Sequence, residues 1–122
     1  MEYREINELE LLIIQVINQH RGSKNIIKRA DMLKALVNGL KRHVSDRQMR
    51  QAIEDLRTDH PEGAYICSTT AGGYYRAESP GELADYLEVD ERRAKMILAR
   101  ISRQRQRAIM AMTQAPLPMR IG

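Results

Sequence analysis

Arginine and glutamine side chains are concentrated in one predicted helix, residues 45–58. Ser45 and Gln48 have the spacing of a capping box, which predicts that the helix begins at Ser45. Apolar residues at helical spacing give this helix an inner face that leaves the arginines and glutamines outside. The inner face consists of Met49, Ala52, Ile53 and Leu56. The candidates for reading bases lie near the helix start: Arg47, Gln48, Arg50 and Gln51.

These four side chains can form hydrogen bonds with the edges of base pairs. Arginine binds guanine with two hydrogen bonds, and glutamine binds adenine in the same way. The alternative is an ordinary solvated helix surface, which has the same residue types. Glu54 opposes phosphate binding unless it accepts from a cytosine amine or pairs with Arg50 or Arg57. The neighbouring segments must therefore decide between the two interpretations.

A second group of polar side chains, in other segments as well, is suited to the DNA backbone. Cations, hydroxyl groups and helix N-termini all bind phosphate oxygens. We expect Lys28, Arg29 and Arg76 to be accessible cations that position a duplex without reading its sequence. The alternatives are solvated surface cations, a helix cap and a polar hairpin tip. The backbone candidates are Lys24, Lys28, Arg29, Ser45, Thr69, Thr70 and Arg76.

The composition fits one compact domain with an extension. The chain has 122 residues, 43% of them hydrophobic, and a formal net charge of +4, which permits nucleic-acid binding. Cys67 is the single cysteine, so an intrachain disulfide is excluded and a reducing cytoplasm is favoured. No apolar run approaches the roughly 18 residues of a membrane span. We expect a cytoplasmic protein with no membrane segment.

An enzyme is not expected from these residues. The three histidines lie on separate segments, and the sequence contains no phosphate-binding glycine loop and no nucleophile with an evident base. The sequence therefore predicts no catalytic residues, no metal site and no cofactor.

Two further helices are predicted before residue 45. Asn7 and Glu10 form a second capping box, and the first helix is expected to run to about His20. The second helix is expected from about Arg29, with the pair Asn38-Gly39 as its stop signal. The residues between these helices, 25–27, are the candidate for a short strand, although the run is shorter than an ordinary strand.

A β-hairpin is predicted after residue 58. The runs 64–68 and 74–77 flank a connection that contains Gly72 and Gly73. Glycine adopts the positive backbone angles that such a turn requires. The pattern therefore predicts two paired strands.

One long helix should follow the hairpin. Ser79 and Glu82 form a third capping box, and beyond Gly81 no proline or glycine occurs before Pro116. A helix of about 35 residues would be about 50 Å long. The rest of the chain should form a globule only about 30 Å across. Much of this helix must therefore project, fold back or pair with another chain.

The charge of the long helix is asymmetric. Residues 92–107 carry seven basic and no acidic side chains, whereas residues 82–91 are acid-rich. Apolar residues at approximate heptad spacing form a seam, interrupted by Asp90 and Gln104. We expect a crossed or antiparallel homodimer, because it places the acidic segment against the arginines; the basic segment is also available to a protein partner. The seam residues are Leu83, Leu87, Ala94, Ile97, Ile101 and Ala108.

The order helix, short strand, helix, capped helix and hairpin resembles that of the winged helix-turn-helix family, and particularly its small phage and prophage members. The resemblance covers about residues 7–78. It implies that the third helix lies in the major groove and that wing residues lie near the backbone or the minor groove. The segments that carry it are Ile26-Ile27-Lys28-Arg29, Val44-Ser45-Asp46-Arg47-Gln48-Met49-Arg50 and Tyr65-Ile66-Cys67-Ser68-Thr69-Thr70-Ala71-Gly72-Gly73-Tyr74-Tyr75.

The sequence thus predicts a mainly α fold with a small β-hairpin. We expect a winged helix domain at residues 1–78, a dimerisation helix at 79–115 and an irregular tail at 116–122. The expected function is that of a dimeric phage or prophage transcriptional regulator that binds double-stranded DNA. The alternative is a winged helix module for protein interaction or assembly in phage DNA packaging or replication, because some winged helices bind only proteins.

Overall fold

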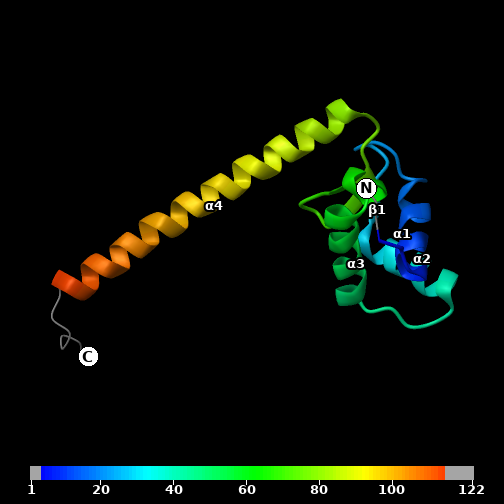
Figure 1. The fold of residues 1–122 in the computed structure, drawn as a ribbon, viewed down its shortest axis with the longest axis horizontal. Helices are drawn as coiled ribbons and strands as arrows, with labels where there is room; N and C mark the ends of the chain where they lie inside the picture. Colours follow the sequence, from blue (N-terminus) through cyan, green and yellow to red (C-terminus); the bar gives the residue numbers. More distant parts are fainter. Residues whose placement is uncertain (1–3, 115–122) are drawn as a thin grey trace. The chain divides into compact units, whose positions relative to one another are not determined.

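The structure is a computed structural model that describes residues 4–114. It is mainly helical, with a small antiparallel sheet and a long C-terminal helix (Figure 1). The chain divides after Ala84 into two compact units, and each is described by itself. The predicted tail, 116–122, lies outside the described residues. The elements are α1 (Glu8–Ile17), β1 (Ile27–Lys28), α2 (Arg29–Leu40), α3 (Asp46–Asp59), η1 (Pro61–Tyr65, a 3-10 helix), β2 (Ile66–Ser68), β3 (Gly73–Arg76) and α4 (Pro80–Gln114).

Helix α1 begins as predicted and ends earlier than predicted. The Asn7 side chain accepts from the Glu10 N–H, and the Glu10 carboxylate accepts from the Asn7 N–H, so the capping box is confirmed. The last helical residue is Ile17, whereas we expected about His20. The N–H of His20 donates to the Ile17 carbonyl oxygen at 2.9 Å, which is a tight turn that closes the helix.

The stop signal predicted for helix α2 is wrong. Asn38-Gly39 does not end the helix, which continues to Leu40 and closes at Lys41 with a left-handed φ of 54°. A Cβ placed on Gly39 would lie 2.5 Å from the Leu12 Cδ2 atom. Gly39 therefore allows α1 and α2 to pack closely, and this tertiary contact explains the glycine better than a helix end does.

Helix α3 has the predicted start and the predicted inner face. The Ser45 Oγ atom accepts from the Gln48 N–H at 3.1 Å, and the Gln48 Oε1 atom accepts from the Ser45 N–H at 2.9 Å. Val44 and Met49, at the positions of a hydrophobic staple, are both buried. The four inner-face residues pack into the same core as the buried residues of α1 and α2. The core thus fixes which side of α3 faces solvent.

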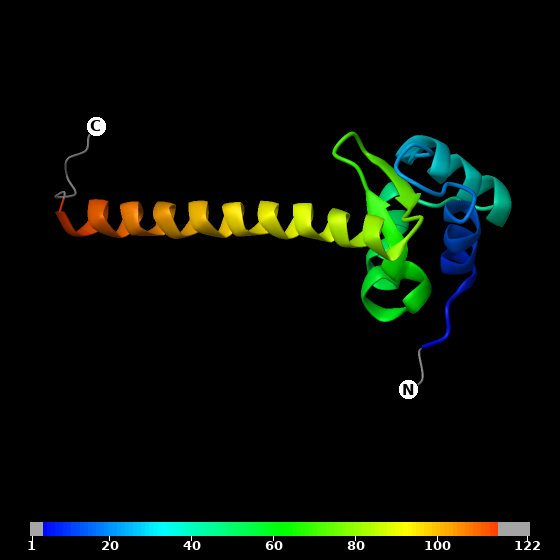
Figure 2. The ribbon, with the colours of Figure 1, turned by 90° about the horizontal axis from the view of Figure 1, so that it is seen from above.

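The strands form one antiparallel sheet in the order β1-β3-β2. The predicted β-hairpin is confirmed as β2–β3, and Figure 2 shows it extending from the sheet. Strand β2 is shorter than the predicted run 64–68, because the first two residues of that run belong to η1. A Cβ on Gly63 would lie 2.1 Å from the Leu56 carbonyl oxygen, so η1 packs directly on the backbone of α3. The short strand β1, residues 27–28, overlaps the candidate run 25–27 and pairs with β3.

The start of α4 forms only half of the predicted capping box. The Ser79 Oγ atom accepts from the Glu82 N–H at 3.1 Å. The Glu82 carboxylate accepts from the Glu78 N–H at 2.7 Å and from the Ser23 N–H at 3.3 Å, instead of returning to Ser79. Glu82 therefore fastens the first turn of α4 to the loop after α1. No helix in the described part of the chain has an apolar stretch long enough to cross a membrane.

Glu10 is a buried carboxylate that joins the N-terminal segment to α1. Its side chain is 2% exposed, and both of its oxygens accept from the Arg4 guanidinium, at 2.9 and 2.6 Å. Hydrogen bonds from Arg4 hold the Glu10 pKa below its usual value, although burial acts in the opposite direction. Arg4 also reaches Asp59 at the end of α3, with Nε 3.3 Å from Oδ2.

We expect the Glu10 ion pair to make the free energy of unfolding depend on pH. Because the folded-state pKa is lowered, this stabilisation is present above the unfolded pKa of about 4.3 and is lost as pH falls through the folded pKa. Glu10→Gln should therefore unfold more easily than the wild type at neutral pH, and the two should converge in acid. Urea unfolding at a series of pH values measures this. Glu8→Gln, an exposed carboxylate on the same helix, is the control; a parallel pH dependence for Glu10→Gln and the wild type would contradict the assignment.

Candidate nucleic-acid interface

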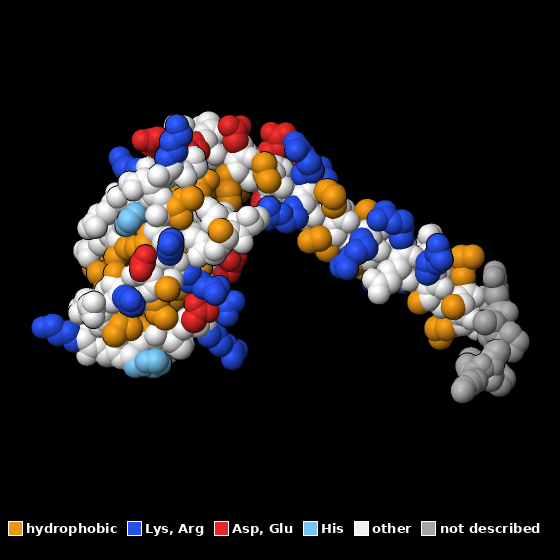
Figure 3. Space-filling model, turned by 180° about the vertical axis from the view of Figure 1, so that it is seen from behind, with side chains coloured by type: hydrophobic (Ala, Val, Ile, Leu, Met, Phe, Trp, Pro, Cys, Tyr) orange, Lys and Arg blue, Asp and Glu red, His pale blue; other side chains and the backbone are white. Residues whose placement is uncertain are grey.

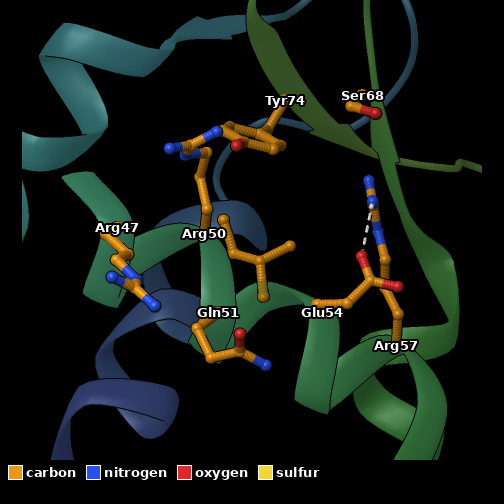
Figure 4. Close-up of a pocket in the computed structure, with 8 residues that line it drawn as sticks. Arg47, Arg50, Gln51, Glu54, Arg57, Ser68 and Tyr74 are labelled. Atoms are coloured by element: carbon orange, nitrogen blue, oxygen red, sulfur yellow. Dashed lines mark ion pairs between the residues drawn. The ribbon is translucent and has the colours of Figure 1, made fainter.

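The exposed face of α3 forms a ridge between two hollows. Arg47 and Gln51 line both hollows, and we call these two residues the α3 ridge. The first hollow, of about 420 Å³, lies between α3 and the sheet, with Ser68 and Tyr74 on the sheet side (Figure 4). The second lies on the other flank of α3, toward α1 and Arg42. A convex helix with free space on both flanks has the shape that enters a major groove.

Arg47 and Arg50 differ in their availability. Arg47 is exposed, and its side chain forms no hydrogen bond or ion pair with any residue in 4–114. The Arg50 Nε atom lies 2.9 Å from Asp46 Oδ2, and the Arg29 Nε atom lies 3.3 Å from Asp46 Oδ1. Asp46 thus joins the first turns of α2 and α3 and partly neutralises two of the predicted DNA-binding arginines. Arg47 is the α3 arginine with a free guanidinium.

The Gln48 side chain is held in the helix cap. Its Oε1 atom accepts from the Ser45 N–H, and two-bond recognition of adenine requires both the oxygen and the nitrogen of the amide. Ser45 is likewise engaged, through its Oγ atom. In this conformation the Gln48 amide therefore cannot make the two-bond contact predicted for it.

Gln51 is held by an acidic neighbour on α3. Its Nε2 atom donates to Asp55 Oδ1 at 2.9 Å, one helical turn away. Both residues line the second hollow. The Gln51 side chain is exposed, and the hydrogen bond to Asp55 engages only its amide nitrogen. Recognition of a base would require this nitrogen to exchange Asp55 for a base edge.

Arg76 is not the accessible cation that we expected. Its side chain is only 19% exposed, and its guanidinium lies over the Tyr65 ring, 5.0 Å from the centroid. Its Nη1 atom is 3.8 Å from Glu62 Oε2. Arg76 therefore holds β3 against η1. A phosphate would have to compete with Tyr65 and Glu62 for its guanidinium.

Other backbone candidates meet at one place beside the hairpin. Lys28, Arg29 and Thr69 line a third hollow, between the start of α2 and the hairpin turn. Thr69 also shapes the turn, because its Oγ1 atom accepts from the Gly73 N–H at 3.0 Å. Thr70 is exposed at the tip, and Lys24 is exposed in the loop before β1. The structure thus groups three of the predicted backbone contacts and leaves Lys24 and Thr70 outside that hollow.

The sequence interpretation missed three residues that line the α3 hollows: Arg42, Ser68 and Tyr74. Arg42 lies just before the Ser45 cap, so its nearness to the helix start was a usable signal. Tyr74 forms part of the sheet side of the first hollow, and burial raises the pKa of its hydroxyl. Ser68 and Tyr74 are paired across β2 and β3, a register that only the fold reveals.

Helix α3 itself is not electropositive. It contains three arginines and four acidic residues. Arg57, the third arginine, donates through Nε to the Ile66 carbonyl oxygen at 3.1 Å and lies 3.7 Å from Glu54, an ion pair drawn in Figure 4. Attraction for a polyanion must therefore come from residues outside α3.

The predicted seam of α4 differs along its length in exposure. Leu87 is 52% exposed and Ile97 is 45% exposed, whereas Leu83 and Ile101 are half-buried. Ala94 and Ala108 are exposed. The seam therefore leaves large apolar side chains open to solvent in a single chain.

Comparisons with known proteins add no family to this geometry. No family model, curated protein or solved structure matches the chain. Within the part of the chain that the structure describes, no group of three or more His, Cys, Asp or Glu side chains is placed to hold a metal ion. The functional evidence is therefore the α3 ridge, its two hollows and the charges around them.

Proposed function

We propose that the protein binds double-stranded DNA with the α3 ridge in the major groove. The observation that carries this proposal is the unpaired Arg47 beside the Gln51 amide, on a convex strip between two hollows. These side chains are the types that recognise guanine and adenine edges. The hollows leave space for the sugar-phosphate backbones on either side of the groove.

The arrangement around α3 supports a winged helix-turn-helix domain. In this proposal α2 and α3 are the helix-turn-helix pair, and the β2–β3 hairpin is the wing. The hairpin is fastened to the start of α2, because the Arg29 N–H donates to the Gly72 carbonyl oxygen at 3.0 Å. Lys28, Arg29 and Thr69 would then contact the DNA backbone from one place.

The proposed role is that of a dimeric, cytoplasmic regulator of phage or prophage transcription. The resemblance to small phage and prophage proteins supports the role, and the exposed seam of α4 supports the dimer. A second candidate is a winged helix module that binds a protein in phage DNA packaging or replication. It is favoured by one observation, the four acidic residues of α3 against three arginines.

Salt dependence separates these two functions. We expect binding to genomic and random duplex DNA to weaken steeply with salt, because each neutralised phosphate releases counterions. Lys28→Ala should lower the slope of log affinity against log salt by about one unit. Lys34→Ala, which removes an exposed lysine of α2 outside the third hollow, is the matched control and should leave the slope unchanged. Fluorescence anisotropy on labelled duplexes measures the slopes of the two variants. A chain that binds neither genomic nor random DNA would favour the protein-interaction module.

A further inference from the structure

The second half of α4 contains the largest concentration of positive charge in the described chain. Residues 92–114 include seven basic side chains and no acidic one, and six of the seven are arginine. Figure 3 shows these cations interspersed with hydrophobic side chains along the helix. We propose that Arg100, Arg103 and Arg107, here called the arginine stripe, form a second site that binds the phosphate backbone of nucleic acid.

The arginine stripe differs from the basic residues that precede it. Arg92, Arg93 and Lys95 each lie within 3.1 to 3.5 Å of an acidic residue one turn earlier, Glu88, Asp90 and Glu91 respectively. The side chains of the three stripe arginines form no hydrogen bond or ion pair with any residue between 4 and 114. Their charge is therefore uncompensated within the described chain.

The stripe residues share one face of α4. They are three and four residues apart, so their side chains are neighbours along about 10 Å of helix at roughly 1.5 Å per residue. Like charges at this spacing destabilise a helix, and a bound polyanion would remove that repulsion. Guanidinium groups bind phosphate oxygens in a two-bond geometry, which lysine does not provide.

Nucleic acid fits this surface better than a lipid membrane does. Helices that lie on membranes commonly carry Trp or Phe as well as Leu on their apolar face, and this chain contains no Trp and no Phe. The apolar seam is broken by Asp90 and Gln104, so α4 has no continuous apolar face to insert into a bilayer. The backbone of nucleic acid requires only the charged face.

This site does not require base reading by α3. It would bind random and specific DNA alike, because phosphate contacts carry no sequence information. It also explains how a chain with a weakly charged α3 would attract DNA. Loss of the stripe should thus weaken binding to every sequence, whereas loss of Arg47 should reduce the preference between sequences.

The test uses the full chain and a control on the opposite side of the same helix. Arg105 lies two residues from Arg103 and from Arg107, which places it on the other side of α4, and it is equally exposed. Arg103→Gln and Arg105→Gln remove the same charge, and glutamine keeps the helix propensity of arginine. Circular dichroism and sedimentation check that helix content and oligomeric state are unchanged.

We expect Arg103→Gln to lower the salt slope on random duplex DNA by about 0.9 unit, and Arg105→Gln to leave it unchanged. The triple variant Arg100→Gln, Arg103→Gln, Arg107→Gln should lower the slope by about 2.7 units. Equal effects of the two single variants would overturn the proposal, because binding would then depend on total charge. A triple variant that keeps its DNA slope but loses binding to phosphatidylserine vesicles would also overturn it and assign the surface to membranes.

Discussion

The chain with Leu87→Lys and Ile101→Lys should be a monomer and should bind its DNA site about 100-fold to 10,000-fold more weakly than the wild type. The two residues belong to the α4 seam, in which Leu87 is 52% exposed and Ile101 is half-buried. A second copy would cover these side chains, and two linked DNA-binding units gain affinity from high effective concentration. Analytical ultracentrifugation measures the mass, and titration of a preferred DNA fragment measures the affinity.

The control for this variant lies on the other side of α4. Val89 and Met96 are also exposed apolar residues, at 51% and 68%, but they lie outside the seam. Val89→Lys with Met96→Lys adds the same charge and should remain dimeric. If the wild type is itself a monomer at micromolar concentration, or if the seam variant stays a dimer through the exposed Leu11 of α1, the α4 dimer is wrong.

An antiparallel pair of α4 helices agrees best with the residues of the seam. In a parallel pair, Asp90 would face Asp90 of the second copy inside the apolar contact, which is unfavourable. In an antiparallel pair, seam positions with the same spacing oppose Asp90 to Ile101 and Ala94 to Ile97. The acid-rich residues 82–91 then lie at the level of the arginines of the second copy. Arg103 lies on the side of α4 away from the seam and stays available to phosphate, whereas Arg100 and Arg107 immediately precede the seam residues Ile101 and Ala108 and flank the seam.

The features that the sequence predicted correctly are local ones. The capping boxes at Asn7 and Ser45 depend on residues three positions apart, and the inner face of α3 depends on a regular repeat. The β2–β3 hairpin follows from glycines between two short runs. In each case the physical cause lies within one segment, so the segment alone contains the information.

The features that could not be predicted depend on contacts between segments. Gly39 matched a helix stop because its contact with Leu12 of α1 is invisible in the sequence. Arg76 was expected to be free because Tyr65 and Glu62, which hold it, are far from it along the chain. Residues alone give the chemical type of a side chain, whereas its availability depends on the partners that the fold provides.

Asp46 limits which arginines of the candidate site are available to DNA. Its carboxylate holds both Arg29 and Arg50, so two arginines chosen for their chemistry are already paired. Asp46 lies beside Arg47 and one helical turn before Arg50, so the pair Asp46–Arg50 was predictable from the sequence. The pair Asp46–Arg29 was not, because it joins two separate helices. Of the four residues proposed to read bases, Arg47 and Gln51 are the two that line both hollows.

Arg47→Ala should weaken binding to the preferred DNA site by about 1 to 3 kcal/mol and should affect random DNA less. Arg47 is the unpaired α3 arginine, so its removal breaks no side-chain hydrogen bond or ion pair within the described residues, and its loss reports on DNA directly. The site is obtained by selecting bound genomic fragments, and the affinities for that fragment and for random duplex are compared at one salt concentration. Gln51→Ala should behave in the same way with a smaller loss, because Gln51 first has to leave Asp55.

Gln48→Ala is the informative control for Arg47→Ala. It removes the return hydrogen bond of the α3 capping box, so we expect a loss of about 0.5 to 1.5 kcal/mol in the free energy of unfolding, the net contribution of one hydrogen bond. The ratio of the affinities for specific and random DNA should not change, because the Gln48 amide is bound to Ser45. Equal losses on both DNAs for Arg47→Ala would make Arg47 a phosphate contact. No loss on either DNA would show that α3 does not enter the groove, and the protein-interaction module would then be the better function.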